Sequence, residues 1–254
     1  MDNNDNKENF LDWMKKVSKD EIKTSFMEWL IARQEDKRLV YSLGQVELRS
    51  LKMPGINYLN NLFGNYYEEC KGLQFINKYE DFNKWGKQIE LDKRRVIYCD
   101  SREQNTLCFK NTKSLRKKLD FGDYAFSDAL WSGNVVIERK SLNDLIGTLF
   151  SGYDRFIREI ERAKNDDACL VILVECNLSD SIDYRNRKTL NYHITIPPEV
   201  IFHKVRNLIQ QYSHIQFLFV HSHNKAAEIV EKLFSLGSQI KKYDLQLLYD
   251  LNKI

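Results

Sequence analysis

A run of six apolar residues, Cys169–Val174, constrains the fold of this chain more than any other stretch. A strand with no polar position has to be covered on both faces, which is typical of inner strands of parallel or mixed sheets. Further apolar runs at residues 94–99, 121–126, 135–138 and 216–220 alternate with helical patterns at residues 112–118, 141–150, 154–164, 197–212 and 225–234. The alternation predicts an α/β fold class for residues 93–238, with a central mixed sheet flanked by helices.

The N-terminal third of the chain has a different pattern. Apolar residues recur at helical spacing in residues 10–17, 19–33, 45–52, 56–63 and 75–85, which predicts a small helical domain over residues 1–92. Ser18 followed by Glu21 fits a capping box. A cluster of aromatic and amide residues in this domain either packs internally or stacks on unpaired bases. The cluster comprises Asn57, Tyr58, Asn60, Asn61, Asn65, Tyr66 and Tyr67.

The 254 residues carry a formal net charge of +3, and Lys and Arg exceed Asp and Glu only in residues 93–254. This mild excess permits nucleic-acid binding without indicating it. The five cysteines form no CxxC pair, which argues against a disulfide framework or zinc site and favours an intracellular, cytoplasmic or nuclear location. No apolar run is long enough for a membrane span and the N-terminus lacks signal-peptide features, so we expect no membrane association.

The residues with the clearest chemical meaning lie near the ends of three predicted strands. Asp123 and Glu138 each stand near the end of an apolar run, and Lys140 shares the face of Glu138 by strand alternation. Carboxylate oxygens bind Mg²⁺ or Mn²⁺, the ions that assist water in attacking a phosphodiester. Asp100 and Glu103 follow another strand and provide a second acidic side. The arrangement predicts metal-dependent phosphodiester cleavage.

Two neighbouring residues have more than one interpretation. Arg139 faces the opposite side of its strand and reaches either a phosphate or a structural carboxylate. Asp144 stands three residues after Ser141, so it either caps the following helix or belongs to the site. The pair His221 and His223 is either a fragment of a transition-metal site or ordinary polar sequence after a strand.

The joint pattern resembles the nuclease domain of the XPF family of structure-specific endonucleases. Gly122-Asp123-Tyr124 and Glu138-Arg139-Lys140-x-x-x-Asp144 are similar to the family signature GDxnERKx3D. Asp100-Ser101-Arg102-Glu103 is similar to its D-x-R-E element, and residues 144–152 to its D-L-I-x-S-L-x-x-G helix and turn. Residues 170–175 resemble the strand P-x-x-I-V-E. The resemblance covers residues 94–237 and implies a restriction-endonuclease-like core.

The resemblance also implies roles for these residues. One Mg²⁺ or Mn²⁺ ion would be held by Asp123, Glu138 and the carbonyl of Arg139. Asp100 and Glu103 would hold a second ion or the water, Lys140 would be catalytic and Asp144 would support the site. The expected activity is endonucleolytic cleavage of DNA at branched, flap or single-strand/duplex boundaries, in repair or recombination. The family also pairs nuclease domains, which implies a homodimer or heterodimer.

Basic and aromatic residues near the site are candidates for contact with DNA phosphates. These candidates are Arg102, Tyr153, Arg155, Arg158, Arg185, Arg187 and Lys188. The sequence departs from the family in having no helix-hairpin-helix motif after Gly237, where residues 239–254 are expected to form a tail, and no GK[ST] helicase loop. Two alternatives stay open: a non-catalytic DNA-binding or scaffold subunit, and a restriction or recombination nuclease of the same superfamily. Retention of the acids favours an enzyme.

Overall fold

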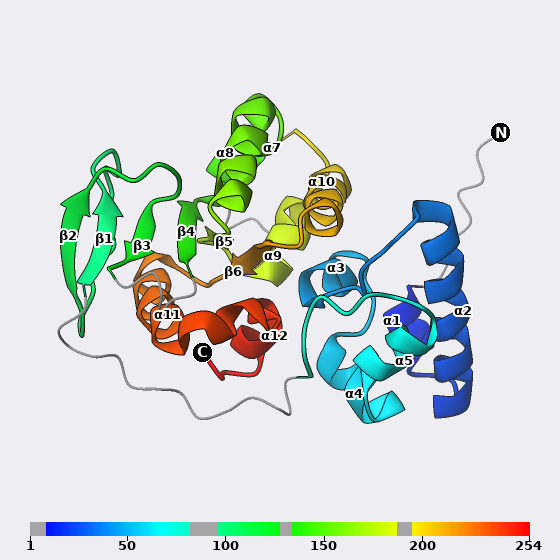
Figure 1. Ribbon diagram of the computed structural model, residues 1–254. Helices are drawn as coiled ribbons and strands as arrows, with labels where there is room; N and C mark the ends of the chain where they lie inside the picture. The colour runs from blue at the N-terminus through cyan, green and yellow to red at the C-terminus, as the bar shows by residue number, and fades with distance from the viewer. Residues whose placement is uncertain (1–8, 82–95, 128–133, 187–194) are drawn as a thin grey trace. The chain divides into compact units, whose positions relative to one another are not determined.

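The structure is a computed structural model that describes residues 9–81, 96–127, 134–186 and 195–254 (Figure 1). The chain divides into two compact units, Met1–Lys78 and Tyr79–Ile254. The boundary expected at residue 92 falls in a segment outside the described residues. Among the helices of the described part, none combines the length and apolar character that a membrane span requires.

The second unit is built on a six-stranded sheet with the strand order β2-β1-β3-β4-β5-β6. The strands are β1 (Val96–Asp100), β2 (Lys113–Lys117), β3 (Tyr124–Phe126), β4 (Val135–Lys140), β5 (Cys169–Val174) and β6 (Ile215–Phe219). Strands β4, β5 and β6 are parallel to one another, β1 is parallel to β2, and β3 is antiparallel to both of its neighbours. The mixed sheet expected from the sequence is confirmed.

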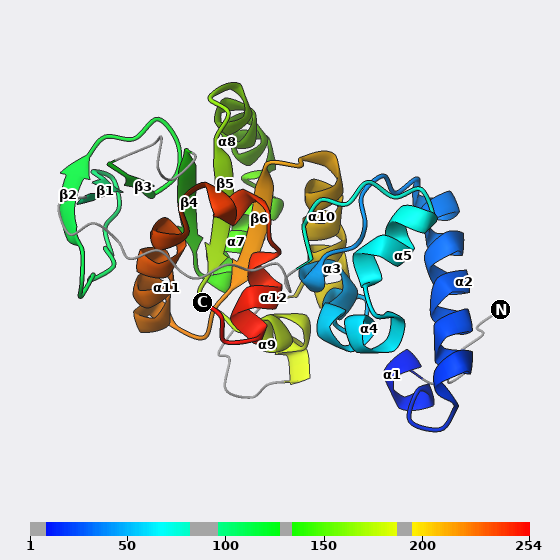
Figure 2. The same cartoon turned by 60° about the horizontal axis from the view of Figure 1, so that its bottom comes forward.

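Helices cover both faces of this sheet (Figures 1 and 2). One face contacts α7 (Leu142–Leu149), α8 (Tyr153–Asn165) and α10 (Pro198–Gln211), with α9 (Leu178–Ile182) beside α10. The other face packs on α11 (His223–Leu236), η3 (Gly237–Lys241) and α12 (Leu245–Asp250). The short helix η2 (Tyr184–Asn186) follows α9. Every residue of β5 is buried, as expected for an apolar strand covered on both sides.

Two expectations for this unit are wrong. Residues 112–118 do not form a basic helix, because Lys113–Lys117 pair with β1 as edge strand β2. All five residues of β2 are exposed, so their sequence carries no apolar periodicity, and lysines are common on edge strands. Residues 239–254 are not a tail either: Leu245, Leu248 and Ile254 belong to the core between α11 and the sheet.

The first unit consists of α1 (Phe10–Trp13), α2 (Lys19–Lys37), α3 (Gln45–Ser50), α4 (Ile56–Phe63) and α5 (Tyr66–Gly72). The expected capping box is present, with Ser18 Oγ accepting a hydrogen bond from Glu21 N. The helix expected over residues 75–85 is wrong where it is described, since residues 75–81 are not helical. Tyr66 and Tyr67 are fully buried, which supports internal packing of the aromatic cluster, whereas Tyr58 is exposed.

Candidate active site

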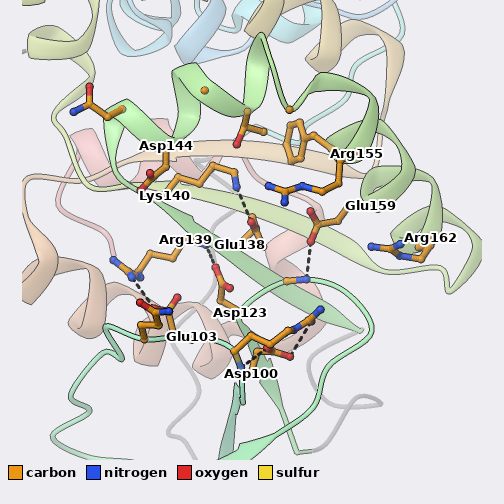
Figure 3. Close-up of a pocket in the computed structure, with 18 of the residues that line it drawn as sticks. Asp100, Glu103, Asp123, Glu138, Arg139, Lys140, Asp144, Arg155, Glu159 and Arg162 are labelled. Atoms are coloured by element: carbon orange, nitrogen blue, oxygen red, sulfur yellow. Dashed lines mark hydrogen bonds and ion pairs between the residues drawn. The ribbon is translucent and has the colours of Figure 1, made fainter. Parts of the chain in front are cut away.

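The candidate site residues meet at one edge of the sheet because of how the strands run. Strands β1 and β4 end at the edge where antiparallel β3 begins. The connection is direct: Asp100 N donates to Asp123 O, and Asp123 N donates to Ile137 O, each at 2.8 Å. Asp100, Asp123 and the end of β4 therefore lie side by side, as Figure 3 shows. The sequence separates Asp100 from Glu138 by almost forty positions, and strand pairing removes that distance.

Gly122 places Asp123 at this edge. Its φ of +68° lies in the left-handed region, and an added Cβ would come within 2.3 Å of Val136 Cγ1. Gly122 N also donates a hydrogen bond to Glu159 Oε1 of α8 at 3.0 Å. The residue before the metal-ligand candidate therefore has to be glycine for both conformational and steric reasons.

Substituting Gly122 with alanine is expected to destabilise the protein. The Cβ would strain the backbone and displace Val136, so we expect a loss of roughly 2 kcal/mol or more in the free energy of unfolding. Gly147 of α7 provides the control, because a Cβ there meets nothing within 4 Å. Alanine at Gly147 is expected to be neutral or stabilising. Urea unfolding of both variants checks this, and equal midpoints would contradict it.

Asp123 and Glu138 form a desolvated pair of acids facing one cleft. Asp123 Oδ2 accepts a hydrogen bond from Arg139 N at 2.8 Å, and Glu138 Oε1 accepts one from Lys140 Nζ at 2.6 Å. Burial, together with the negative charge of Glu103, raises the pKa of Asp123 to about 6. Burial also raises the pKa of Glu138, with Asp123 and Glu159 adding to the effect. Ionising either buried carboxyl group costs free energy, and a bound cation would lower that cost.

Lys140 lies beside this pair at the inner end of the cleft. Its side chain is only 9% exposed, and the ammonium lies 5.5 Å from the centre of the Phe156 ring on α8. The expected shared face of Glu138 and Lys140 is confirmed by their contact. A buried ammonium held between a carboxylate and an aromatic ring is positioned to interact with an anion that enters the cleft.

Arg139 points to the other side of β4, where it contacts structural carboxylates. Its Nη2 lies 3.0 Å from Glu103 Oε1, and its Nη1 lies 3.0 Å from Glu175 Oε2. Glu175 Oε1 in turn lies 2.7 Å from His223 Nδ1. Burial lowers the pKa of Arg139, but Glu175 and Glu103 outweigh that effect and raise it above the ordinary value. This ion-pair network fixes the backbone of Arg139, and with it the N–H that binds Asp123.

Asp100 is occupied by hydrogen bonds. Its Oδ1 accepts from Arg102 N and Nε, and its Oδ2 accepts from Arg102 Nη2 and Leu119 N. Burial opposes ionisation of Asp100, but these bonds prevail and lower its pKa to about 2. Four bonds use the acceptor capacity of a carboxylate, so in this arrangement Asp100 orders the loop rather than offering a free ligand.

Fewer side chains are therefore available as metal ligands than the sequence suggested. Within the described ranges, no group of three His, Cys, Asp or Glu side chains is arranged to hold one metal ion. Asp123 and Glu138 nevertheless supply hard oxygen donors in a buried, mutually repelling pair, which fits Mg²⁺ or Mn²⁺. Glu103 is bonded to Arg139, and a role for it toward a second ion stays a prediction.

The cleft in front of these residues has a volume of about 920 Å³. Arg102, Arg155 and Arg162 line it and provide positive charge around the acids. Figure 3 labels Arg155 and Arg162 among the lining residues. The sequence reasoning missed Glu159 and Arg162 as cleft residues. Their spacing from Arg155, four and seven positions along α8, places all three on one helix face and would have identified them.

The remaining candidates lie in different places. Asp144 lines the cleft and also caps α7, with Ser141 Oγ donating to its Oδ2 at 2.6 Å, so both interpretations find support. Tyr153 packs against the ammonium of Lys204, and Arg158 is exposed on α8 outside the lining of the cleft. Arg185 donates to the carbonyl of Thr195. Arg187 and Lys188 fall outside the described residues.

Comparison with known proteins adds a family and two structures. The model of the ERCC4 domain family matches residues 91–233. Two solved structures of XPF from Aeropyrum pernix, one of them a complex with DNA, are each 21% identical in sequence with a TM-score of 0.41. The matches cover 56% and 57% of this chain, and 64% and 68% of those chains, respectively. No curated protein matches.

Proposed function

Since the chain belongs to the ERCC4 domain family, with an XPF-type nuclease domain, we propose that it is a Mg²⁺- or Mn²⁺-dependent DNA endonuclease. Membership of this family supports a nuclease-type role in DNA processing. The observation that supports catalysis in this chain is the buried pair of Asp123 and Glu138, with the ammonium of Lys140 2.6 Å from Glu138, in a cleft bordered by arginines. Burying two carboxylates costs free energy, and a scaffold subunit that does not cleave DNA would gain nothing from it.

The residues of the cleft have three proposed roles: holding the metal ion, acting on the water or phosphate, and fixing the backbone. Asp123, Glu138 and the carbonyl of Arg139 would hold the ion, which when bound supplies an activated water and stabilises the leaving oxygen. Lys140 orients the attacking water or the scissile phosphate through its ammonium group. Arg139 holds the backbone of β4 in place through Glu103 and Glu175. Phe156 of α8 lines the cleft beside Lys140 and limits access of bulk water to the acids.

Contacts to the substrate are assigned to the arginines that line the cleft. Arg102 has a side chain that is 64% exposed, and Arg155 and Arg162 line the same cleft from α8. Several cations in the lining of the cleft match a strand whose phosphates pass through it. Cleavage at flaps, branches or single-strand/duplex boundaries, a role in repair or recombination, and pairing into a homodimer or heterodimer all belong to this proposal.

Cleavage assays with the full chain test the proposal. Flap, fork, linear duplex and single-stranded DNA would be incubated with Mg²⁺, with Mn²⁺ or with EDTA. We expect metal-dependent cleavage of at least one junction substrate, and a loss of at least about 100-fold for Lys140→Gln. Lys253→Gln, an exposed lysine outside the cleft, is the control and should cleave normally. Full cleavage by Lys140→Gln would contradict the assignment of Lys140.

The same assays discriminate the alternatives. A non-catalytic subunit would bind the junction substrates in EDTA yet leave every substrate intact with either metal. A restriction or recombination nuclease would cut linear duplex at defined sequences in preference to flaps and forks. Preferential cleavage of flaps and forks would support a structure-specific endonuclease.

A further inference from the structure

A second cleft lies on the opposite face of the sheet from the first. It has a volume of about 950 Å³ and lies between the connection from β1 to β2, helix α11 and Tyr249 of α12. Strand β6 is parallel to β4 and β5, so the residues after it lie at the edge that carries Lys140. The lining residues are Cys108, Phe109, Lys110, Asn111, His221, Ser222, His223, Asn224, Lys225, Ala227, Glu228, Glu231 and Tyr249.

The walls of the second cleft are held in place by contacts to the rest of the fold. Tyr249 Oη accepts a hydrogen bond from His221 N at 3.1 Å. The ring of Phe109 packs edge-on against Tyr124, with centroids 5.7 Å apart. Both rings are partly buried against the core and still line the cleft, so each offers an aromatic surface of fixed position. Such surfaces are suited to stacking on unpaired bases.

The charges of the second cleft favour an anion over a cation. Glu228 is engaged by two lysines, Lys225 at 3.0 Å and Lys232 at 3.2 Å. Glu231 accepts two hydrogen bonds from Asn111, at 2.7 and 3.1 Å. The acids are thus already bonded, while Lys110 is exposed at the rim. Aromatic surfaces beside a solvent-facing ammonium match the base and phosphate of a nucleotide.

A chain of polar contacts joins the second cleft to the active site. His223 lines the second cleft and contacts Glu175, and Glu175 contacts Arg139, which lines the first. Arg139 N in turn binds Asp123. The two clefts therefore share one wall at the edge of the sheet, and a strand leaving the acids across that wall would enter the second cleft.

We propose that the second cleft binds an unpaired stretch of the DNA strand that passes through the active site. Its bases stack on Phe109 and Tyr249, and Lys110 contacts a phosphate. The assignment rests on the proposed nuclease function and names the part of the substrate that must be single-stranded.

Cys108 provides a reporter that does not depend on catalysis. All five cysteines fall in the described residues; four are buried, and Cys108 is exposed in the lining of the second cleft. The intact, metal-free protein would be labelled with fluorescein maleimide with and without a saturating single-stranded oligonucleotide. We expect the oligonucleotide to slow labelling of Cys108 at least about fivefold, because a bound strand covers the thiol. Cys108→Ser should remove the labelling itself.

Two charge reversals complete the test. Lys110→Glu is expected to reduce the protection of Cys108 to less than about twofold, whereas Lys253→Glu, at a surface lysine outside both clefts, should keep it. Unchanged labelling while fluorescence anisotropy reports bound oligonucleotide would overturn the proposal, as would absence of binding. Equal protection in both variants would also overturn it. Protection without metal-dependent cleavage would instead refute the nuclease function and leave the binding site standing.

Discussion

Replacing Asp123 with asparagine is expected to abolish metal-dependent cleavage and to stabilise the metal-free protein at pH 8. Asparagine loses the negative charge that a divalent ion requires, so we expect cleavage to fall at least about a thousandfold. Its side-chain oxygen still accepts the hydrogen bond from Arg139 N. The substitution therefore removes the buried charge while keeping the local structure.

The gain in stability follows from the raised pKa of Asp123, which burial and the charge of Glu103 place at about 6 rather than 3.8. The folded state binds the proton more tightly than the unfolded state, so the wild-type free energy of unfolding falls as pH rises through this interval. The Asp123→Asn variant has no carboxyl group at this position, so its free energy of unfolding does not fall for this reason. We expect the two proteins to differ little at pH 4, and the variant to be more stable by roughly 1 to 3 kcal/mol at pH 8.

Denaturant unfolding in EDTA at the two pH values, together with cleavage assays in Mg²⁺, measures both effects. Asp166→Asn is the control, because Asp166 is exposed at the end of α8 and does not line the cleft. It should cleave normally and show no comparable gain at pH 8. If Asp123→Asn destabilised the protein at pH 8, the contacts of the Asp123 carboxylate would outweigh the cost of burying its charge, and the prediction would be wrong.

Removing the chain after Lys242 is expected to prevent the nuclease unit from folding. The deletion exposes core positions filled by Tyr243, Leu245, Leu248 and Ile254. It also removes Gln246, whose Oε1 accepts from Phe219 N at 2.8 Å and thereby satisfies the outer edge of β6. Each buried apolar side chain contributes about 1.5 to 3 kcal/mol, so four of them are comparable to the whole stability of a typical domain.

A point substitution keeps this expectation measurable if the truncated protein is insoluble. Leu248→Ala is expected to lower the free energy of unfolding by about 2 to 5 kcal/mol, because Leu248 is fully buried. Lys253→Ala, five residues further on and exposed, should change it by less than about 0.5 kcal/mol. Urea titrations compare the two, and a soluble, cooperatively unfolding truncated protein would show that the segment is dispensable.

The sequence by itself determined the class of fold and predicted the central acids of the candidate site. Cys169–Val174 required a strand covered on both faces, and that strand is β5. The spacing of Gly122, Asp123, Glu138 and Lys140 indicated a shared cleft, and the structure places these four residues in its lining. Signals of this kind are local, because strand alternation and a glycine turn depend on a few neighbouring residues.

Only the tertiary structure decided what depends on contacts between distant segments. Lys113–Lys117 has no apolar pattern and became a strand by pairing with β1. Tyr243, Leu245, Leu248 and Ile254 are core residues because they pack with α11 and the sheet. The engagement of Asp100 by Arg102 and Leu119, and of Arg139 by Glu103 and Glu175, likewise arises where the strands end together. Periodicity cannot encode such pairings, since the partner of each group lies far away in the chain.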